Sequence, residues 1–475
     1  MSNATSQPLL LQWLNSPSAN QALYSWICGR SWFRPRLPLA STGHVVASFQ
    51  IDDNGVHVLV LFQVEFSGQT TSIYSLGLKI AQVACGNEFV AEIPSTTSSA
   101  YIIDSSPDPD FARAILSAIA SPKNLVSGLV ASPSHRLRDQ SSTLDSLPAP
   151  RLLAGEQTNR SFFFDDRYVL KILRAIDTEL SPEVEIGQHF LQVNRQVPCP
   201  AFLGALSVDL PGRPMASVAI VHEYLANSED LWRLTLRFLE VTYRRIVRDG
   251  KVPATDDYEQ IARRLGEATA DLHLSLLSEH DAAFVPELVE SSYQLSLHQS
   301  LLELSDRALD ALQLAVSYSP SRYVGALIGC WSRFQRFLGE LLQSPLNGYR
   351  IRCHGDYHLG QVLSCGNRLM IVDFEGEPSR PAKDRKRKRL AQADLAGILR
   401  SFDYAAHKSI SDWSCACPGD LSLIQDYART WVDSSSQRFL DEYRAHVSGV
   451  LRASPETESR NLKLCYVEKV LNEIL

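Results

Sequence analysis

The chain has 475 residues, 45% of them hydrophobic and 21% charged, so it can build more than one packed core. A formal net charge of −7 argues against a general nucleic-acid-binding protein, which is usually basic. No run of about 18 apolar residues occurs, and the first residues lack the pattern of a secretory signal, so we expect a cytoplasmic protein that does not span a membrane.

Residues 1–90 are predicted to contain a helix and a β-hairpin. Apolar spacing predicts a helix around 9–26, and residues 44–51 and 56–66 alternate as strands do. The intervening Asp52–Gly55 contains an Asn-Gly pair, which is typical of a tight hairpin turn. These signals predict a small β-rich subdomain.

Residues 91–225 are predicted to complete a second, intermediate subdomain. Segment 95–150 is rich in Ser, Pro and Asp and predicts loops around one helix at 110–120. Strand patterns then follow, with one helical pattern between them. The strands are expected at 160–164, 168–173 and 217–224, and the helix at 182–192.

Residues 226–475 are predicted to be mainly helical. Apolar residues recur at intervals of three and four, and two short strands interrupt them at 349–353 and 368–374. The helices are expected at 231–248, 258–277, 286–317 and 331–342. A β-rich first half and a helical second half predict an α+β fold.

The strongest chemical signal lies in two segments of this helical half. Arg352–Gln361 contains His-Gly-Asp, and Leu369–Pro378 is an apolar strand that ends in Asp-Phe-Glu-Gly. The order matches a kinase catalytic loop followed by its metal loop, with Asp356 as the base, and Gln361 and Asp373 as Mg²⁺ ligands. Mg²⁺ prefers such hard oxygen ligands while it bridges the phosphates of ATP.

A phosphate-contacting lysine is expected upstream. Lys171 lies in the strand at 168–173, and a kinase would pair it with a glutamate on the next helix. Glu185 is the first candidate and Glu183 the alternative. Ser181 and Pro182 predict the N-terminus of that helix.

The remaining nucleotide contacts are predicted from two segments. Gly155–Ser161 precedes the lysine strand and could present Thr158, Asn159 and Ser161 to phosphates, although it lacks a glycine-rich motif. Glu223 and Leu225 end the strand where two lobes would join, and adenine could bind the backbone there.

The run Lys383–Arg389 is strongly basic. Such runs are mostly solvated surface, and this one directly follows the metal loop. We therefore interpret it as an activation-like segment and expect no nucleic-acid partner.

Three motifs resemble the bacterial maltokinases, a family with an aminoglycoside-phosphotransferase and protein-kinase-like fold. They are His354–Leu363 (HGDYHLGQVL), Asp373–Pro378 (DFEGEP) and Asp394–Ala406 (DLAGILRSFDYAA). Trp32-Phe33 also resembles the opening of that family.

The resemblance implies a bilobal protein with an N-terminal cap subdomain over 1–90, an intermediate subdomain over 91–225 and a helical C-lobe over 226–475. It implies that ATP phosphorylates the anomeric hydroxyl of maltose, giving maltose 1-phosphate for glycogen and α-glucan synthesis. The sugar contacts that it suggests are His358, Glu375, Arg400 and Tyr404. The oligomeric state stays open.

Departures from the family leave alternatives open. The glycine-lysine pair usual after Trp32-Phe33 is absent, and Arg389–Ala393 differs from the relatives. The first alternative is a kinase of another sugar or amino sugar such as glucosamine. Glucosamine kinases carry a metal loop closer to Asp-Phe-Asp-Gly-Asn-Pro, so Glu375 and Glu377 in this chain favour a maltokinase. The second is a catalytically silent, kinase-like binding scaffold.

Overall fold

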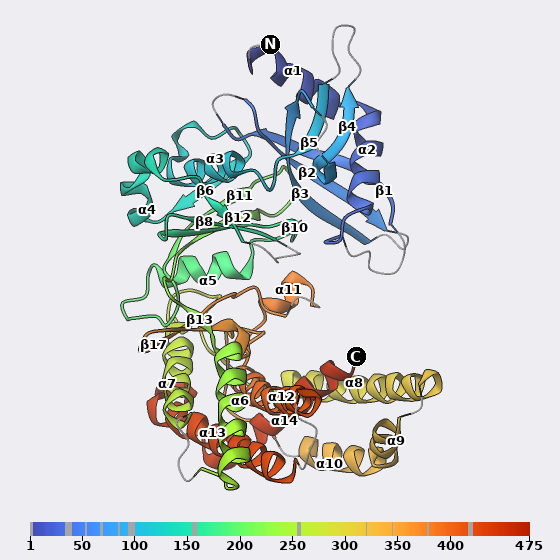
Figure 1. The fold of residues 1–475 in the computed structure, drawn as a ribbon, viewed down its shortest axis with the longest axis vertical. Coiled ribbons are helices and arrows are strands. Elements are labelled where there is room, and N and C mark those ends of the chain that lie inside the picture. The colour runs from blue at the N-terminus through green and yellow to red at the C-terminus, as the bar shows by residue number, and fades with distance from the viewer. Residues whose placement is uncertain are drawn as a thin grey trace. The chain divides into compact units, whose positions relative to one another are not determined.

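The computed structural model describes most of the chain. The described residues are 3–33, 40–52, 55–66, 70–83, 86–93, 100–153, 159–253, 258–319, 321–343, 345–377, 380–416 and 421–475. They form two compact units, one of residues 1–191 and 200–226 and the other of residues 192–199 and 227–475. The first unit holds the two large sheets and the second is mainly helical (Figure 1).

The first unit begins with two helices and a sheet in the order β1-β2-β3-β5-β4, with β10 also paired to β3. These elements are α1 (Asn3–Leu14), α2 (Pro17–Cys28), β1 (Ala40–Gln50), β2 (Val58–Phe66), β3 (Thr70–Ala81), η1 (Gly86–Glu88), β4 (Phe89–Ile93), β5 (Ala100–Asp104) and β10 (Ala175–Ile176). β1 and β2 pair antiparallel, which confirms the predicted hairpin. Gly55 has φ +66°, a backbone conformation that favours glycine.

Strand β2 is buried on both faces. Val58, Val60 and Phe62 pack in one cluster with residues of α1 and α2. Leu59 and Leu61 pack in a second cluster with α3 (Pro109–Ala120) and the other sheet. The apolar run of β2 therefore places it at the centre of the unit, between two cores.

The second sheet of this unit has the order β6-β11-β12-β9-β8-β7. Its elements and neighbours are η2 (Pro122–Asn124), β6 (Leu129–Pro133), α4 (His135–Asp139), η3 (Ser141–Ser146), β7 (Arg151–Leu152), β8 (Arg160–Phe164), β9 (Tyr168–Ile172), α5 (Pro182–Phe190), β11 (Phe202–Val208) and β12 (Ala216–Glu223). Val184 of α5 packs against Phe202 and Ile220 of this sheet. Segment 95–150 thus holds more regular structure than the predicted loops and single helix.

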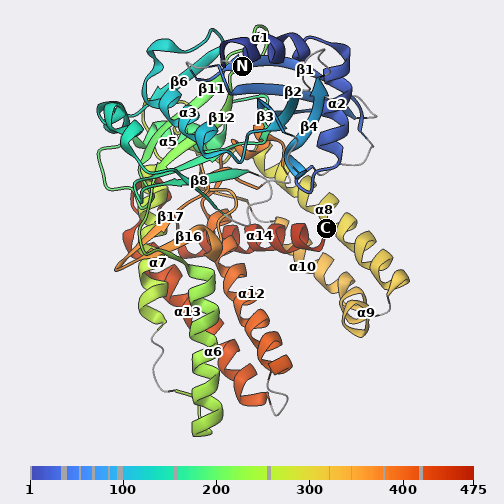
Figure 2. The same ribbon diagram turned by 45° about the horizontal axis from the view of Figure 1, so that its top comes forward.

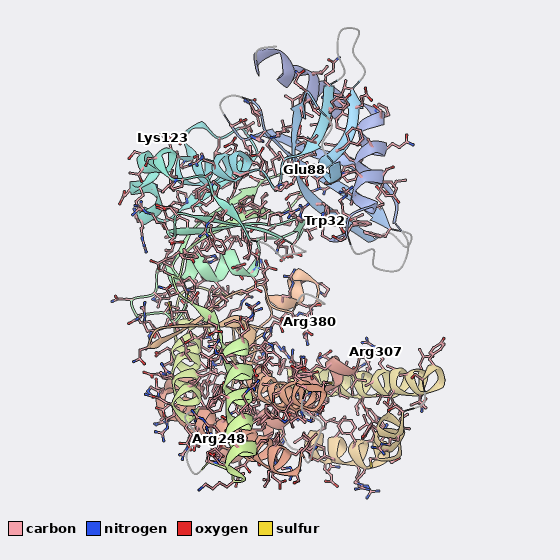
Figure 3. The ribbon with its side chains drawn as sticks, in the orientation of Figure 1. Trp32, Glu88, Lys123, Arg248, Arg307 and Arg380 are labelled. Atoms are coloured by element: carbon pink, nitrogen blue, oxygen red, sulfur yellow. The ribbon has the colours of Figure 1, made fainter. Side chains whose placement is uncertain are left out.

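Arg174 connects the two sheets of the first unit. Its guanidinium lies 4.4 Å from the ring centre of Trp32, labelled in Figure 3, and 3.7 Å from Asp104. Its backbone carbonyl accepts a hydrogen bond of 2.8 Å from the N–H of Ser75 in β3. Burial lowers the pKa of Arg174 to about 10, which still leaves the side chain charged at neutral pH.

The second unit is a set of long helices with two small three-stranded sheets, β13-β16-β17 and β14-β15-β18. The helices are α6 (Leu231–Asp249), α7 (Glu259–Ser275), α8 (Ser291–Tyr318), α9 (Arg322–Gly329), α10 (Trp331–Gln343), η4 (Leu359–Gln361), α11 (Ala382–Arg385), α12 (Gln392–Ala416), α13 (Ser422–His446), η5 (Gly449–Leu451) and α14 (Pro455–Ile474). The strands are β13 (Glu229–Asp230), β14 (Glu287–Leu288), β15 (Tyr349–Ile351), β16 (Val362–Cys365), β17 (Arg368–Ile371) and β18 (Arg389–Leu390). Helix α12 packs against α6, α13 and α14, and Figure 2 shows α6 and α12 side by side.

Among the described residues, none of the helices combines the length and the apolar character needed to cross a membrane.

Candidate active site

The His-Gly-Asp loop follows β15 and is held by its own histidine. His354 is buried, its Nε2 lies 2.9 Å from the carbonyl oxygen of Val372, and its Nδ1 lies 3.4 Å from the N–H of Asp356. Since the carbonyl can only accept and the N–H can only donate, Nε2 carries the proton. The imidazole therefore ties the loop with Asp356 to the segment that leads into Asp373.

A second anchor of this loop is Asp394 at the start of α12, which is 1% exposed. Its two oxygens accept hydrogen bonds from the N–H groups of His354 (2.8 Å) and Gly355 (3.0 Å) and from Nε2 of His273 (3.1 Å). Burial acts to raise the pKa of Asp394, but the hydrogen bonds from His273 and Gly355 outweigh it and keep the pKa below the ordinary value. Asp394 is thus a buried carboxylate that fixes the loop backbone.

Gly397 lets α12 approach the same loop. A Cβ at this position would lie 2.2 Å from the carbonyl oxygen of Tyr357, so no larger residue fits without moving the loop. One turn further, Ser401 accepts a hydrogen bond of 3.1 Å from the N–H of Leu359. The helix-interior glycine, which by itself disfavours a helix, is explained by this close approach.

The two predicted metal ligands lie together. Nε2 of Gln361 donates to Oδ2 of Asp373 at 3.0 Å, and the N–H of Val372 donates to the carbonyl of Gln361 at 2.9 Å. Asp373 has φ +67°, a left-handed conformation that costs a non-glycine residue roughly 1–2 kcal/mol. An amide oxygen and a carboxylate at one place fit the oxygen-ligand preference of Mg²⁺.

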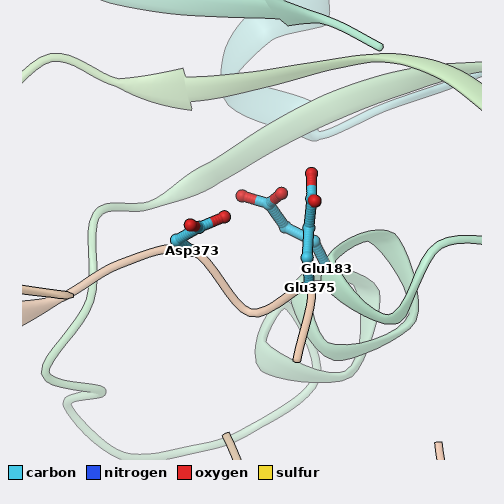
Figure 4. Close-up of side chains that lie close together, drawn as sticks. All are labelled: Glu183, Asp373 and Glu375. Atoms are coloured by element: carbon cyan, nitrogen blue, oxygen red, sulfur yellow. The ribbon is translucent and has the colours of Figure 1, made fainter. Parts of the chain in front are cut away.

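Glu375 lies two residues beyond Asp373 on the same loop, and both side chains are drawn in Figure 4. The loop turns back at Gly376, which has φ +71°. The Cα of Gly376 lies 3.3 Å from the position that a Cβ on Gly355 would occupy, so the two glycines allow the catalytic and metal loops to touch.

In the first unit, Lys171 on β9 pairs with Glu183 on α5. Nζ lies 3.3 Å from Oε2 of Glu183, and the two side chains are 14% and 5% exposed. Ser181 caps α5 by accepting from the N–H of Glu183 at 3.2 Å, as the sequence indicated. The predicted first choice, Glu185, is a half-buried residue of the same helix. The structure therefore pairs Lys171 with Glu183, the alternative that the sequence left open.

The other predicted nucleotide contacts of the first unit have different surroundings. Thr158 lies outside the described residues. Oδ1 of Asn159 accepts from the backbone N–H of Arg174 at 3.2 Å, and Ser161 lies opposite Lys171 in the β8–β9 pair. Of the described residues of this segment, 159–161, Ser161 is the one that the sheet register places opposite the lysine.

At the strand end with Glu223 and Leu225, several polar groups already bind other residues of the protein. The Glu223 carboxylate lies 2.9 Å from Nη2 of Arg136, and its backbone N–H donates to the carbonyl of Ala201 at 2.9 Å. Tyr224 donates to the carbonyl of Arg167 at 2.9 Å. Two N–H groups at this end are thus used within the protein, and an adenine contact by Glu223 would need its carbonyl.

Three of the four predicted sugar contacts line one pocket of about 360 Å³ in the second unit. They are His358, Arg400 and Tyr404, whereas Glu375 is not part of its lining. Residues that sequence reasoning did not select also line it, namely Trp232, Gly360, Gly397, Ser401, Lys469 and Glu473.

The pocket adjoins the proposed base. Oδ1 of Asp356 lies 3.6 Å from Nζ of Lys469, and Oδ2 lies 4.0 Å from Nε2 of His358. Nδ1 of His358 accepts from the N–H of Gly360 at 3.1 Å. Burial lowers the pKa of His358, in spite of the Asp356 charge, so this imidazole is neutral at pH 7. Both carboxylate oxygens of Asp356 are thus flanked by pocket residues.

Arg400 serves as a clamp inside the pocket. Its Nε and Nη2 lie 2.9 and 2.8 Å from Oε2 of Glu473, and Nη1 lies 3.3 Å from Asp403. Tyr404 also donates to Oε2 of Glu473 at 3.2 Å, and its ring centre lies 4.7 Å from the guanidinium. Arg400 therefore shapes the pocket wall by holding Glu473 and Tyr404.

Arginines in and just before the segment Lys383–Arg389 hold the loop that contains Asp373. Nη1 of Arg385 donates to the carbonyl of Glu375 at 2.9 Å, and the Arg385 stem lies against Gly376. Arg380, labelled in Figure 3, lies 2.7 Å from Glu377 and 3.1 Å from Glu468 of α14.

The end of the segment is paired as well. Lys388 lies 2.8 Å from Glu287, and Arg389 lies 2.6 Å from Glu468. Burial acts against the charge of Glu468, but Arg389 and Arg380 lower its pKa below the ordinary value. These cations serve as internal braces of the second unit.

Sequence reasoning did not select Asp394, which contacts the His-Gly-Asp loop, or Trp232, Lys469 and Glu473, which line the pocket. Asp394 opens a motif that the sequence comparison singled out, and an acid at the start of a buried helix is a signal that could have identified it. Lys469 and Glu473 lie about 110 residues beyond the catalytic loop on α14, and no local pattern marks them.

Comparison with known proteins supports the chemistry of these loops. Residues 150–376 match the model of a family described as "Phosphotransferase enzyme family". The match covers just under half of the chain and includes Lys171, Asp356, Gln361 and Asp373.

Two curated relatives are both named glucosamine kinase. The one from Streptacidiphilus jiangxiensis is 24% identical over 293 residues, which are 61% of this chain and 60% of the relative. The one from Mycolicibacterium smegmatis is 27% identical over 290 residues, 59% of this chain and 65% of the relative. The chain therefore matches less than two thirds of the length of either relative.

Solved structures of glucosamine kinases have the same fold. One described as crystal form A has a TM-score of 0.65 at 18% identity and covers 97% of this chain and 92% of that chain. Another, in complex with glucosamine, ADP and inorganic phosphate, has a TM-score of 0.63 at 18% identity and covers 96% and 93%. The likeness confirms the predicted kinase-like fold of mixed helices and strands, and these relatives carry the name of the first alternative function.

Proposed function

We propose that this chain, whose residues 150–376 match the phosphotransferase enzyme family, is a kinase that transfers the terminal phosphate of ATP to a hydroxyl group of a sugar. Similarity to two glucosamine kinases supports a sugar acceptor. The aromatic rings of Trp232 and Tyr404 in the pocket beside Asp356 suit a sugar ring, and its volume lies within the range of small-molecule sites.

The observation that carries the proposal is that contacts within one unit fix the two loops that hold Asp356, Gln361 and Asp373. His354 forms hydrogen bonds to both loops, the Asp394 carboxylate accepts from the backbone of the first loop, and the Gln361 amide donates directly to Asp373. A scaffold without catalytic function would not need a buried carboxylate that accepts two consecutive loop N–H groups, nor a strained aspartate at the second loop.

Each residue then has a chemical task. Asp356 receives the proton of the sugar hydroxyl while the hydroxyl oxygen bonds to the terminal phosphorus and ADP departs. Gln361 and Asp373 would hold Mg²⁺, which when bound neutralises the charge on the phosphates. Lys171 would contact the donor phosphates, with Glu183 as the positioning residue that keeps its ammonium in place.

Two sugars are candidates for the acceptor. Glucosamine is favoured by the names of the relatives. Maltose is favoured by the resemblance of His354–Leu363 to the maltokinase motif, and would give maltose 1-phosphate for α-glucan synthesis in the cytoplasm. The relatives and the motif thus point to different sugars, so the proposed function names a sugar hydroxyl as the acceptor and leaves the choice of sugar to the assay.

The test is incubation of the protein with ATP, Mg²⁺ and a panel of sugars that includes glucosamine, maltose and glucose. ADP formation is followed by a coupled assay, and phosphorus NMR identifies the hydroxyl that becomes phosphorylated. The matched control is Asp356→Asn, which should reduce turnover at least about a hundredfold because it removes the proton acceptor. ADP formation no faster than in this variant with every sugar would reject the kinase and favour the silent scaffold.

A further inference from the structure

The last helix of the chain brings two opposite charges to the acceptor pocket. Lys469 and Glu473 are one turn apart on α14 and both line the pocket. Nζ of Lys469 lies 3.6 Å from Oδ1 of Asp356, and the side chains are 29% and 22% exposed. Residues at positions i and i+4 of a helix lie on the same face, so α14 presents both groups together.

The carboxylates around Lys469 are already paired with other groups. Glu468 is held by Arg380 and Arg389 at 3.1 and 2.6 Å. Glu473 accepts from Arg400, as described above. Within the described part of the chain, Asp356 is the carboxylate that pairs with Lys469.

The pocket holds no described carboxylate without a cationic partner. Its described charged residues are Lys469 and Arg400 against one carboxylate, Glu473. Asp356 pairs with Lys469, and both Glu473 and the adjacent Asp403 pair with Arg400, so an additional cation at the pocket would have to compete with these pairs.

We propose that Lys469 selects acceptors by charge, so that the pocket takes a sugar in uncharged form and disfavours one with an ammonium group near the reacting hydroxyl. This inference rests on the proposed sugar-kinase function and defines its substrate class. The hydroxyl must reach Asp356, and Asp356 touches Lys469, so a cationic substituent a few ångströms from that hydroxyl meets the lysine charge at short range. Partly screened repulsion at such a distance corresponds to about a tenfold loss in kcat/KM or more.

Glucose and glucosamine form the matched pair of substrates, because they differ only in a hydroxyl or an amine on one carbon. The measured quantity is the ratio of kcat/KM for glucose to kcat/KM for glucosamine at pH 6, where the amine is protonated. Maltose replaces glucose if it is the faster neutral substrate. We expect the wild-type ratio to exceed one.

Lys469→Met removes the charge and keeps the length of the side chain. We expect it to lower the ratio about tenfold, whereas Lys469→Arg retains the wild-type ratio. Lys463→Met is the control, because Lys463 is an exposed residue of the same helix and does not line the pocket. It should leave the ratio unchanged.

The ratio compares two substrates on one protein, so partial unfolding of a variant does not alter it. A wild-type preference for protonated glucosamine would overturn the proposal even if Lys469→Met failed to fold. An unchanged ratio in a folded Lys469→Met variant that still phosphorylates sugars would also overturn it, while leaving the proposed kinase intact. A wild-type protein that phosphorylates no sugar would instead reject the proposed function.

Discussion

The most informative substitution outside the reacting groups is Asp394→Asn. Oδ1 of Asp394 accepts from Gly355, and Oδ2 accepts from both His354 and His273. An asparagine keeps one oxygen and replaces the other with an NH₂ group, which can only donate. Whichever way the amide is turned, at least one buried donor of the loop or of His273 loses its acceptor and meets another donor.

The expected loss of stability follows from these contacts. A hydrogen bond to a charged acceptor contributes roughly 1.5–3 kcal/mol, and a bond to a neutral acceptor about half of that. One bond is lost and the other two become neutral, so the free energy of unfolding of the second unit should fall by about 3–6 kcal/mol. Because Gly355 and Asp356 are adjacent, a shift of the loop by about 1 Å should also lower kcat about a hundredfold.

The pH dependence has a definite sign. The pKa of Asp394 is lower in the folded protein than its ordinary value. Its stabilising effect is therefore complete above the unfolded pKa of about 3.9 and is lost as the pH falls through the folded pKa. The stability difference between wild type and Asp394→Asn should be constant from pH 5 to 8 and should shrink below about pH 4.

Urea unfolding followed by tryptophan fluorescence, at several pH values, measures this difference. The control is Asp412→Asn on the same helix, an exposed residue paired with Lys408, which should change stability by less than about 0.5 kcal/mol. A loss in Asp394→Asn no larger than in the control, or full retention of kcat, would show that Asp394 does not hold the loop.

Three further substitutions test individual parts of the site. Glu183→Gln should raise KM for ATP and lower kcat about tenfold or more, because it removes the charge partner of Lys171. The control Glu185→Gln on the same helix should change both constants less than about threefold. Equal effects of the two substitutions would contradict the observed pairing. Asp373→Ala should abolish Mg²⁺-dependent binding of ATP in calorimetry, and ATP affinity that still increases with Mg²⁺ would exclude it as a ligand. Trp232→Ala should raise KM for the sugar about tenfold while KM for ATP stays constant, and an unchanged sugar KM would place the acceptor elsewhere.

Local patterns in the sequence were sufficient for most elements. The β1–β2 hairpin, α3, α5 and the long helices α6, α7, α8 and α10 were predicted close to their observed bounds, because their apolar spacing and turn residues act within a few positions. Strands β3, β11 and β16 were not predicted. They are stabilised mainly by pairing with strands on both sides, which a short window of sequence does not record.

The candidate site divides in the same way. Asp356, Gln361 and Asp373 were predicted because a kinase spaces them closely along the chain, and the structure joins Gln361 to Asp373. The choice between Glu183 and Glu185 depended on the rotation of α5, which the cap residues alone do not define.

The sequence by itself determined the kind of fold and indicated the two loops that contain Asp356 and Asp373, because both depend on residues that are neighbours in the chain. Only the tertiary structure identified Asp394 as the anchor of the catalytic loop, and Lys469 and Glu473 as parts of the acceptor pocket. These residues act across helices α12 and α14, where long-range packing decides which charges face one another.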